Sequence, residues 1–426
     1  FYGDDFTVRG GASDASIWEK MVSAEQFANE YEMPLVRFIE GTGGGGSVKS
    51  VERNNYTYVP FNPGWDKVIA NLSKIPVVSL ALGPVAGLGA ARLVSSHFSV
   101  MVKKTSQVFV AGPPLVENIG EKVSKEELGG SEIHGTNGVI DNIANNEIEA
   151  MKMAKSFLSY MPNSINRLPF KITNKDKIDR RDEFLLSAVP KNKRDGYDIL
   201  PIINSIVDKS SFFEIGKLYG LSVITGLARL DGFPVIVIAN NPQVYGGGWT
   251  SDACQKIIKI IDLAQVFHFP VLNLVDNPGF VIGKTAEKNA TIKFGAKALA
   301  AIYQFKNPMC SVILRKVFGV AGAANLNHTN FKYRFAWPSA DTGSLPFEGG
   351  IEAAYKAEIK SSKDPKEYIR QIHSKLNKVT SPFRTAEKFL IEDIIDPRDT
   401  RKKVCIWINL AYKTLKTGKS FFGFRP

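Results

Sequence analysis

One structural unit occurs in each half of this chain: an apolar stretch followed by a turn of very small residues. The first copy reads VVSLALGPVAGLGAA at residues 77–91, and the second reads VILRKVFGVAGAA at residues 312–324. The apolar, partly β-branched residues predict a buried strand in each copy. The small residues let a ligand approach the backbone, so that main-chain N–H groups can point at an oxygen atom. Close packing of a helix on a sheet is the structural alternative for either run.

A second predicted strand precedes each copy and ends in an acidic residue. Residues 34–40, PLVRFIE, end in Glu40 before a run of four glycines, and residues 270–276, PVLNLVD, end in Asp276 before a Pro-Gly pair. Because the same features recur in the same order, the sequence predicts an internal duplication at the scale of domains. Glu40 and Asp276 are then equivalent residues, and each could cap a turn or take part in a reaction.

The chain has 426 residues, which is too long for one hydrophobic core and favours two domains. Prolines and charges replace apolar runs after residue 162, so we place the first domain at 1–163, a connector at 164–200 and the second domain at 201–426. Strand and helix patterns alternate, which indicates an α/β fold with functional sites at strand ends.

Three local patterns give testable expectations for single elements. Residues 6–9 have the pattern of a strand, residues 17–31 have helical spacing of apolar residues, and residues 398–415 predict a last helix.

The net charge of +12 is spread along the chain rather than gathered in a stripe. The densest basic stretch, residues 171–194, is interleaved with Asp and is interpreted as a solvated connector. No motif of basic and aromatic residues supports nucleic-acid binding, and a polyanionic, nucleotide-bearing cofactor is the competing explanation of the charge.

The three cysteines, Cys254, Cys310 and Cys405, are too far apart for metal-ligand spacing and predict a reducing, intracellular compartment. No apolar run approaches the length of a membrane span. The chain starts at Phe1, so a targeting segment upstream would not be visible.

No side-chain nucleophile or base stands out in this sequence. There is no G-x-S-x-G motif, and the glycines at 43–46 lack the Lys-Ser/Thr of a phosphate loop. A structural role is the expectation for each of the five histidines, which are His97, His134, His268, His328 and His373. Two turns with exposed amides therefore suit chemistry with two developing oxyanions, in which a substrate or cofactor supplies the base.

Motifs across the whole chain resemble the carboxyltransferase (β) subunit of biotin-dependent acyl-CoA carboxylases, of the propionyl-CoA and methylcrotonyl-CoA carboxylase type. In the second half they are NNP at 240–242, DNPGF at 276–280, LRKVFG at 314–319, AWPSA at 336–340 and IDPRDTR at 395–401. In the first half they are GPVAG at 83–87, KTS at 104–106 and ELGG at 127–130.

This resemblance implies two tandem crotonase-like domains of the ClpP/crotonase ββα-spiral type and a hexamer of this chain. It also implies active sites between the first domain of one protomer and the second domain of another. The activity would be transfer of CO2 from carboxybiotin, held by a carrier protein or domain of a biotin carboxylase partner, to the α- or vinylogous γ-carbon of an acyl-CoA. The cofactor would supply the missing base. The location would be the mitochondrial matrix in a eukaryote or the cytoplasm in a bacterium.

The same resemblance implies roles for particular residues. The N–H groups of Gly87 and Leu88 would hold the thioester enolate oxygen, and those of Val320 and Ala321 the ureido oxygen of biotin. The residues implied to bind the cofactor are Gly279, Phe280, Gly319, Gly322 and Ala323, and no metal ligand is implied.

The chain departs from the family pattern at Leu88 and Val320, where the family has glycine or a similarly small residue, and at Glu40-Gly41-Thr42-Gly43, where it commonly has Asp-Ser-Gly-Gly. Two alternatives stay open on the sequence: the carboxyltransferase of a biotin-dependent decarboxylase, and a catalytically weak scaffold subunit. The small Gly322 and Ala323 predict room for acyl groups longer than acetyl.

Overall fold

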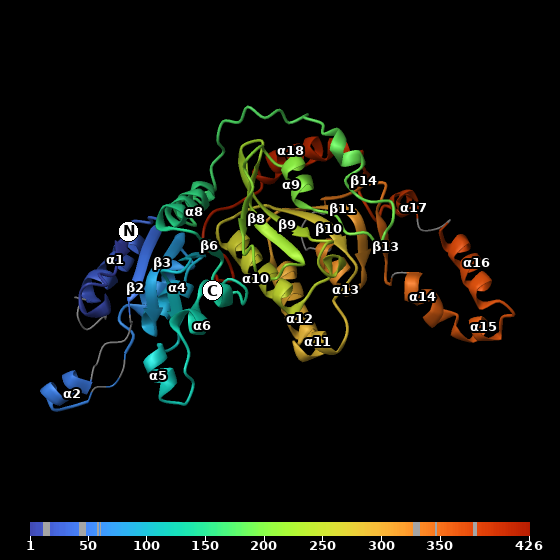
Figure 1. Ribbon diagram of the computed structural model, residues 1–426. Helices are drawn as coiled ribbons and strands as arrows, with labels where there is room; N and C mark the ends of the chain where they lie inside the picture. The colour runs from blue at the N-terminus through green and yellow to red at the C-terminus, as the bar shows by residue number, and fades with distance from the viewer. Residues whose placement is uncertain are drawn as a thin grey trace.

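The chain folds around two separate β-sheets, one built from each half of the sequence (Figure 1). The computed structural model describes residues 1–11, 18–41, 48–57, 59, 61–326, 333–345, 347–377 and 381–426. The glycines at 43–46 and His328, both singled out above, lie outside the described residues.

The first sheet is parallel and has the strand order β1-β2-β3-β4-β6, with β5 paired to the far end of β3. Its strands are β1 (Tyr2–Gly3), β2 (Leu35–Gly41), β3 (Val77–Ala86), β4 (Phe98–Val102), β5 (Gln107–Phe109) and β6 (Asn142–Ala144).

The second sheet has the order β14-β12-β11-β10-β9-β8-β7, with β13 paired to β11; the pairs β7–β8 and β8–β9 are antiparallel, and the other described pairs are parallel. Its strands are β7 (Phe213–Ile215), β8 (Val223–Leu230), β9 (Phe233–Asn240), β10 (Val271–Asn277), β11 (Met309–Phe318), β12 (Tyr333–Ala336), β13 (Asp341–Gly343) and β14 (Asp393–Ile394).

Helices cover both sheets. The first half contains η1 (Arg9–Gly11), α1 (Trp18–Glu30), α2 (Val48–Asn54), α3 (Trp65–Asn71), α4 (Leu88–Val94), α5 (Pro113–Glu117), α6 (Lys125–Gly129), α7 (Ser131–His134) and α8 (Glu147–Tyr160). The second contains η2 (Glu183–Leu186), α9 (Leu200–Ile206), η3 (Tyr245–Gly247), α10 (Ser251–Val266), α11 (Lys284–Lys288), α12 (Thr291–Gln304), α13 (Gly319–Leu326), α14 (Phe347–Ala354), α15 (Lys356–Ser361), α16 (Pro365–Asn377), α17 (Pro382–Glu387), η4 (Pro397–Asp399) and α18 (Thr400–Ala411).

The strand pairing confirms the internal duplication residue by residue. β2 and β10 each have seven residues, and β3 and β11 each have ten. Both pairs shift register at the same point: the partners step from Ile39–Ala81 to Gly41–Val85 in the first sheet and from Val275–Ile313 to Asn277–Val317 in the second. Glu40 is therefore the structural equivalent of Asp276, and the first turn can be aligned with the second.

The two halves share buried surface rather than a flexible hinge. One apolar cluster contains Phe98 and Phe157 from the first half together with Trp249 and Phe267 from the second. Across the same seam, the Lys259 ammonium lies 2.7 Å from a carboxylate oxygen of Asp141. The halves of one chain are thus packed rigidly against each other.

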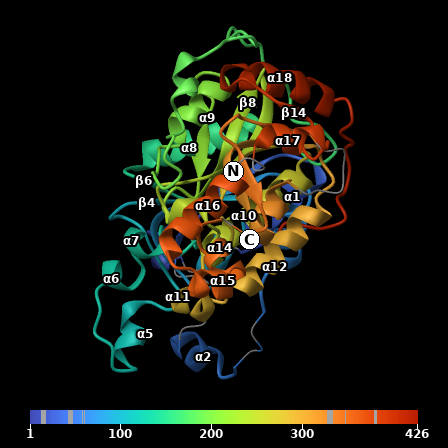
Figure 2. The ribbon, with the colours of Figure 1, turned by 90° about the vertical axis from the view of Figure 1, so that its right-hand side faces the viewer.

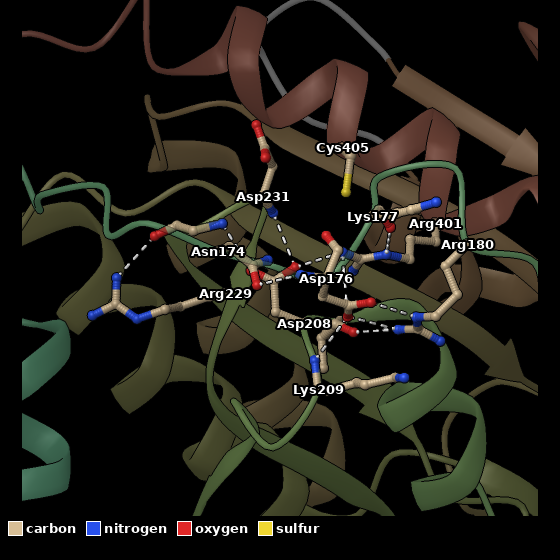
Figure 3. Close-up of polar contacts among 12 residues, drawn as sticks. Asn174, Asp176, Lys177, Arg180, Asp208, Lys209, Arg229, Asp231, Arg401 and Cys405 are labelled. Atoms are coloured by element: carbon tan, nitrogen blue, oxygen red, sulfur yellow. Dashed lines mark hydrogen bonds and ion pairs between the residues drawn. The ribbon is translucent and has the colours of Figure 1, made fainter.

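The connector is mostly exposed to solvent, as interpreted from the sequence, but one part of it is anchored to helix α9 and the segment that follows it. Arg180 forms an ion pair with Asp176 at 2.8 Å (Figure 3). It also donates to the carbonyl oxygens of Ser205 and Val207. The neighbouring Arg401 is fully buried and pairs with Asp208 at 2.8 Å. Some of the connector's alternating charges thus pair with one another, although most of its charged residues remain exposed.

Two of the three local expectations are close to the structure and one is wrong. Helices α1 and α18 occupy the predicted regions, although α18 starts only after the short η4. Residues 6–8, however, form a turn rather than a strand, and the first strand is β1. The Asp5 carboxylate accepts hydrogen bonds from both the N–H and the hydroxyl of Thr7, and such a side-chain turn outweighs the β-branched pattern.

Candidate functional site

The second small-residue turn joins β11 to α13. Gly319 has φ 63°, in the left-handed region that favours glycine, and this reverses the chain directly into the helix. Val320 is 57% exposed, whereas Ala321 is buried. The first N–H groups of a helix have no partner inside it, so the amides of this turn are available to an acceptor.

The first turn, between β3 and α4, repeats the positive φ of the second at its first residue. Gly87 has φ 56° and occupies the position of Gly319 in the repeat. Its N–H donates to the carbonyl oxygen of Phe109 at 3.2 Å. Of the two donors predicted here, the Gly87 N–H is thus already hydrogen-bonded within the protein. The other, Leu88, is the equivalent of Val320 in the second turn.

Asp276, at the end of β10, is clamped by three donors. Its carboxylate accepts from the Tyr197 hydroxyl at 2.8 Å, the Arg315 Nε at 3.0 Å and the Lys316 N–H at 3.0 Å. Asp276 and Arg315 are both buried, and the Arg315 guanidinium also stacks over the Tyr197 ring. Burial, together with the Asp276 carboxylate, raises the pKa of the Tyr197 hydroxyl well above its ordinary value. This carboxylate holds the strand end and is not placed to act as a base.

Glu40 has the equivalent place in the first sheet but lacks such a clamp. Gly83 stands where the second sheet has Arg315, and its Cα is so close that an added Cβ would lie 2.3 Å from a Glu40 carboxylate oxygen. Partial burial, and then the neighbouring Glu147 and Asp4 carboxylates, raise the pKa of Glu40. Among the described residues, no cation pairs with Glu40.

The segment after β10 forms one wall beside the second turn. Gly279 has φ 117°, and its N–H is held by the Asn277 side chain at 2.7 Å. The Phe280 ring packs edge-on against Trp249 with ring centres 6.0 Å apart, and it touches Gly295 of α12 so closely that a side chain there would clash. Gly279 and Phe280 therefore lie on the second sheet with the turn that begins at Gly319.

Gly322 and Ala323 do not play matching roles. A Cβ on Gly322 would lie 3.0 Å from the backbone of Val317, so this glycine lets α13 pack on β11. That is the packing alternative considered for such a run, whereas Ala323 is exposed. Of these two residues, only Ala323 has an exposed position at which the size of the side chain could affect ligand binding.

Three of the described histidines make contacts within the folded chain. His97 is buried against Phe267 and Phe424, and burial lowers its pKa to about 3. His134 Nε2 is 2.8 Å from the Val108 carbonyl oxygen, and His268 Nε2 is 2.7 Å from that of Ile165. These contacts favour the structural role expected for them.

Four residues of the second-half site had no role assigned from sequence: Tyr197, Trp249, Asn277 and Arg315. For Asn277 and Arg315, the only sign of a functional role in the sequence was their position within the recognised motifs. Their contacts join residues far apart in the chain, as with Tyr197 and Asp276, so local pattern could not reveal them.

The two turns of one chain lie apart. Figure 1 places α4 beside the first sheet and α13 beside the second, with α10 and α12 between them. Each turn can stabilise one oxyanion with main-chain donors. In the described part of the chain, neither turn has a side-chain nucleophile paired with a base.

Comparison with known proteins identifies relatives along nearly the whole chain. The carboxyl transferase domain family matches residues 1–422. The mitochondrial propionyl-CoA carboxylase beta chain of Sus scrofa is 31% identical over 411 residues, which cover 95% of this chain and 73% of that protein. The methylmalonyl-CoA decarboxylase subunit alpha of Veillonella parvula is 30% identical over 411 residues, with 95% and 77% covered.

A solved structure shares the fold. The transcarboxylase 12S crystal structure, described as a hexamer assembly with methylmalonyl-coenzyme A and methylmalonic acid bound, superposes with a TM-score of 0.86 at 28% identity. The match covers 99% of this chain and 81% of that one. The two tandem crotonase-like domains expected from sequence are thus confirmed as the fold. Within the described ranges, no helix is long and apolar enough to cross a membrane.

Proposed function

This chain belongs to the carboxyl transferase domain family and is a carboxyltransferase, and we propose that it moves CO2 from a biotin carried by a partner protein to the α- or vinylogous γ-carbon of an acyl-CoA. The observation that carries the proposal is the pair of equivalent turns, one on each sheet, that begin at Gly87 and Gly319. Main-chain donors suit the two oxyanions of such a transfer, and no side-chain base is needed if the cofactor accepts the proton.

The roles of the two turns follow from the family. The first turn would hold the thioester oxygen of the acyl-CoA as it becomes an enolate, through the N–H of Leu88 and, if Phe109 releases it, that of Gly87. The second would hold the ureido oxygen of biotin through the N–H groups of Val320 and Ala321. Biotin, when bound in its N-carboxylated form, supplies the CO2 and the nitrogen that takes the acyl proton.

The donor set of the second turn is suited to biotin. The first N–H groups of α13 have no partner within the helix, and the Phe280 ring offers an apolar surface on the same half. Gly279 and Gly319, both with positive φ, shape the backbone around the turn. A cyclic urea needs such donors for its oxygen and an apolar surface for its ring system.

The complete site would lie between two protomers. One chain keeps its own turns apart, with α10 and α12 between them, so the first domain of one copy would face the second domain of another. We propose the hexamer on this ground and because the similar transcarboxylase 12S structure is described as one. The domain limits 1–163 and 201–426, with a connector at 164–200, belong to this proposal.

The decarboxylase alternative has one specific observation in its favour. The Veillonella parvula relative is named as a methylmalonyl-CoA decarboxylase subunit and is as similar as the carboxylase relatives. The same site would serve both directions, and the partner proteins would decide which one operates. For the acyl group, Ala323 is the remaining residue behind the expectation that propionyl or larger groups are accepted.

The deciding experiment measures carboxylation of acetyl-, propionyl-, butyryl- and octanoyl-CoA with the biotinylated partner, bicarbonate and ATP. We expect a carboxylated acyl-CoA, with kcat/KM for an acyl group longer than acetyl at least about 10-fold above that for acetyl. A wild type that prefers acetyl-CoA contradicts the expected acyl preference. Absence of any carboxylated product, together with no loss of CO2 from the matching carboxylated acyl-CoA, supports the scaffold alternative and refutes the proposal.

A further inference from the structure

Asn277 carries a buried amide that the fold leaves partly unused. The residue ends β10 and is fully buried. Its Oδ1 accepts the Gly279 N–H at 2.7 Å, which fixes the orientation of the side chain. Its Nδ2 has no hydrogen-bond partner among the described residues. A buried amide donor left unpaired costs about 1–3 kcal/mol, so an explanation is required.

The strand geometry places this amide beside the second turn. Alternate residues of β10 share a face, and Asn273 on that face donates to Asn325 in the last turn of α13. Asn277 is further along the strand, beyond the register shift, and is the pairing partner of Val317. The first turn of α13 packs on that same Val317 through Gly322. Asn277 therefore lies at the strand end beside Val317, on which the first turn of α13 packs.

A second unpaired donor lies in the same wall. Trp249 is buried, and its indole Nε1 has no partner among the described residues. Its main-chain N–H donates to the Gly279 carbonyl oxygen at 3.0 Å, and its ring packs against Phe280. The wall thus holds two unpaired side-chain donors next to a helix start, which is an arrangement suited to an acceptor oxygen.

The fold itself does not need an amide at this position. The equivalent residue in the first sheet is Gly41, which occupies the same place in the same register shift. A glycine satisfies the backbone there without any side chain. The unpaired donor is therefore particular to the half that we assign to biotin.

We propose that the Asn277 side-chain amide is a third hydrogen-bond donor of the second turn, acting with the N–H groups of Val320 and Ala321 on the ureido oxygen of biotin. The inference rests on the proposed function, since it takes biotin as the ligand of this turn. A structural alternative is that a trapped water satisfies Nδ2 and that the residue has no contact with the cofactor.

The test compares biotin binding by the wild-type assembly and two variants. Asn277→Leu has nearly the same size but no donor, and Asn277→Asp keeps the acceptor for Gly279 while it replaces the donor by an oxygen. Biotin methyl ester is titrated by saturation-transfer NMR, and KM for free biotin is measured in carboxyl exchange from methylmalonyl-CoA. We expect both variants to bind biotin at least 10-fold more weakly, with KM for the acyl-CoA changed less than twofold.

Asn273→Leu is the matched control, because it removes from the same strand a buried amide whose Nδ2 donor is paired, with Asn325. It should lower the thermal midpoint and leave biotin affinity within twofold. Asn277→Leu also removes the acceptor of the Gly279 N–H and should lower the midpoint as well, so biotin affinity is the property that separates the two variants. Wild-type affinity for biotin in both Asn277 variants would overturn the inference, as would an equal loss in the control. A wild type that neither binds biotin nor exchanges carboxyl groups would instead refute the proposed function.

Discussion

The two halves of this chain share a backbone but not the side chains that secure it. At the end of β10, Asp276 is buried and held by Arg315 and Tyr197. At the equivalent end of β2, Glu40 lies against Gly83, and no cation pairs with it among the described residues. The same strand register is therefore compatible with a neutralised carboxylate in one half and an unneutralised one in the other. The comparison indicates that the strand register does not by itself require the ion pair, whereas a carboxylate as fully buried as Asp276 needs its cation.

The largest effect should follow from breaking the clamp in the second half. Arg315→Met leaves the Asp276 carboxylate buried without its cation, and this should lower the free energy of unfolding by about 3–5 kcal/mol. Urea unfolding measures the change. Lys403→Met is the control, because it removes an ion pair with Asp393 whose side chains are 40% and 44% exposed. The exposed pair should matter by less than about 1 kcal/mol. Equal effects of the two substitutions would show that the clamp has no special importance.

The next largest effect concerns the first amide of each turn. Proline is tolerated at the first helical position but has no N–H, so Leu88→Pro and Val320→Pro each remove one donor. Each should reduce kcat/KM about 100-fold, the loss expected for one oxyanion donor. Steady-state rates with acyl-CoA and with biotin measure it, and circular dichroism checks the fold. A folded variant with more than half of wild-type activity would exclude that amide as a donor.

A smaller effect is expected when the side chain is removed and the amide is kept. Leu88→Gly and Val320→Gly should retain at least about a tenth of the activity, a loss below about 1.4 kcal/mol in the barrier. The reason is that both positions act through the backbone. Rates of the two glycine variants should be compared with those of the proline variants. A glycine variant as inactive as its proline counterpart would assign the function to the side chain.

The smallest effect concerns Glu40 and depends on pH. Its pKa is raised in the folded chain, so ionisation is less favourable folded than unfolded. Glu40 therefore has no effect on stability below its ordinary pKa of about 4.3, and lowers stability as the pH rises towards its raised value. Glu40→Gln should have a slightly higher thermal midpoint than the wild type at pH 7 and an equal one near pH 4. A wild type that is the more stable of the two at pH 7 would contradict the absence of a clamp.

Much of the architecture could be predicted because it depends on local pattern. Apolar, β-branched runs predicted the strands that precede the turns, and their repetition predicted the duplication that the matching strand registers confirm. Turns that depend on side-chain hydrogen bonds were harder to predict from the sequence. Residues 6–9 have a strand pattern, but the Asp5 carboxylate captures Thr7 and forms a turn. Such local side-chain bonds offer the backbone an alternative to strand pairing, and a pattern of apolar residues does not reveal them.

The sequence by itself determined the repeated strand-turn-helix unit, the family and the choice of main-chain amides as candidate donors, since each depends on residues close together in the chain. Only the tertiary structure decided which amides are free. Gly87 donates to Phe109, which lies on another strand, whereas in the second half the buried amide of Asn277 is left unpaired. Hydrogen bonding of this kind depends on strand register and burial, and these are set by contacts between residues distant in sequence.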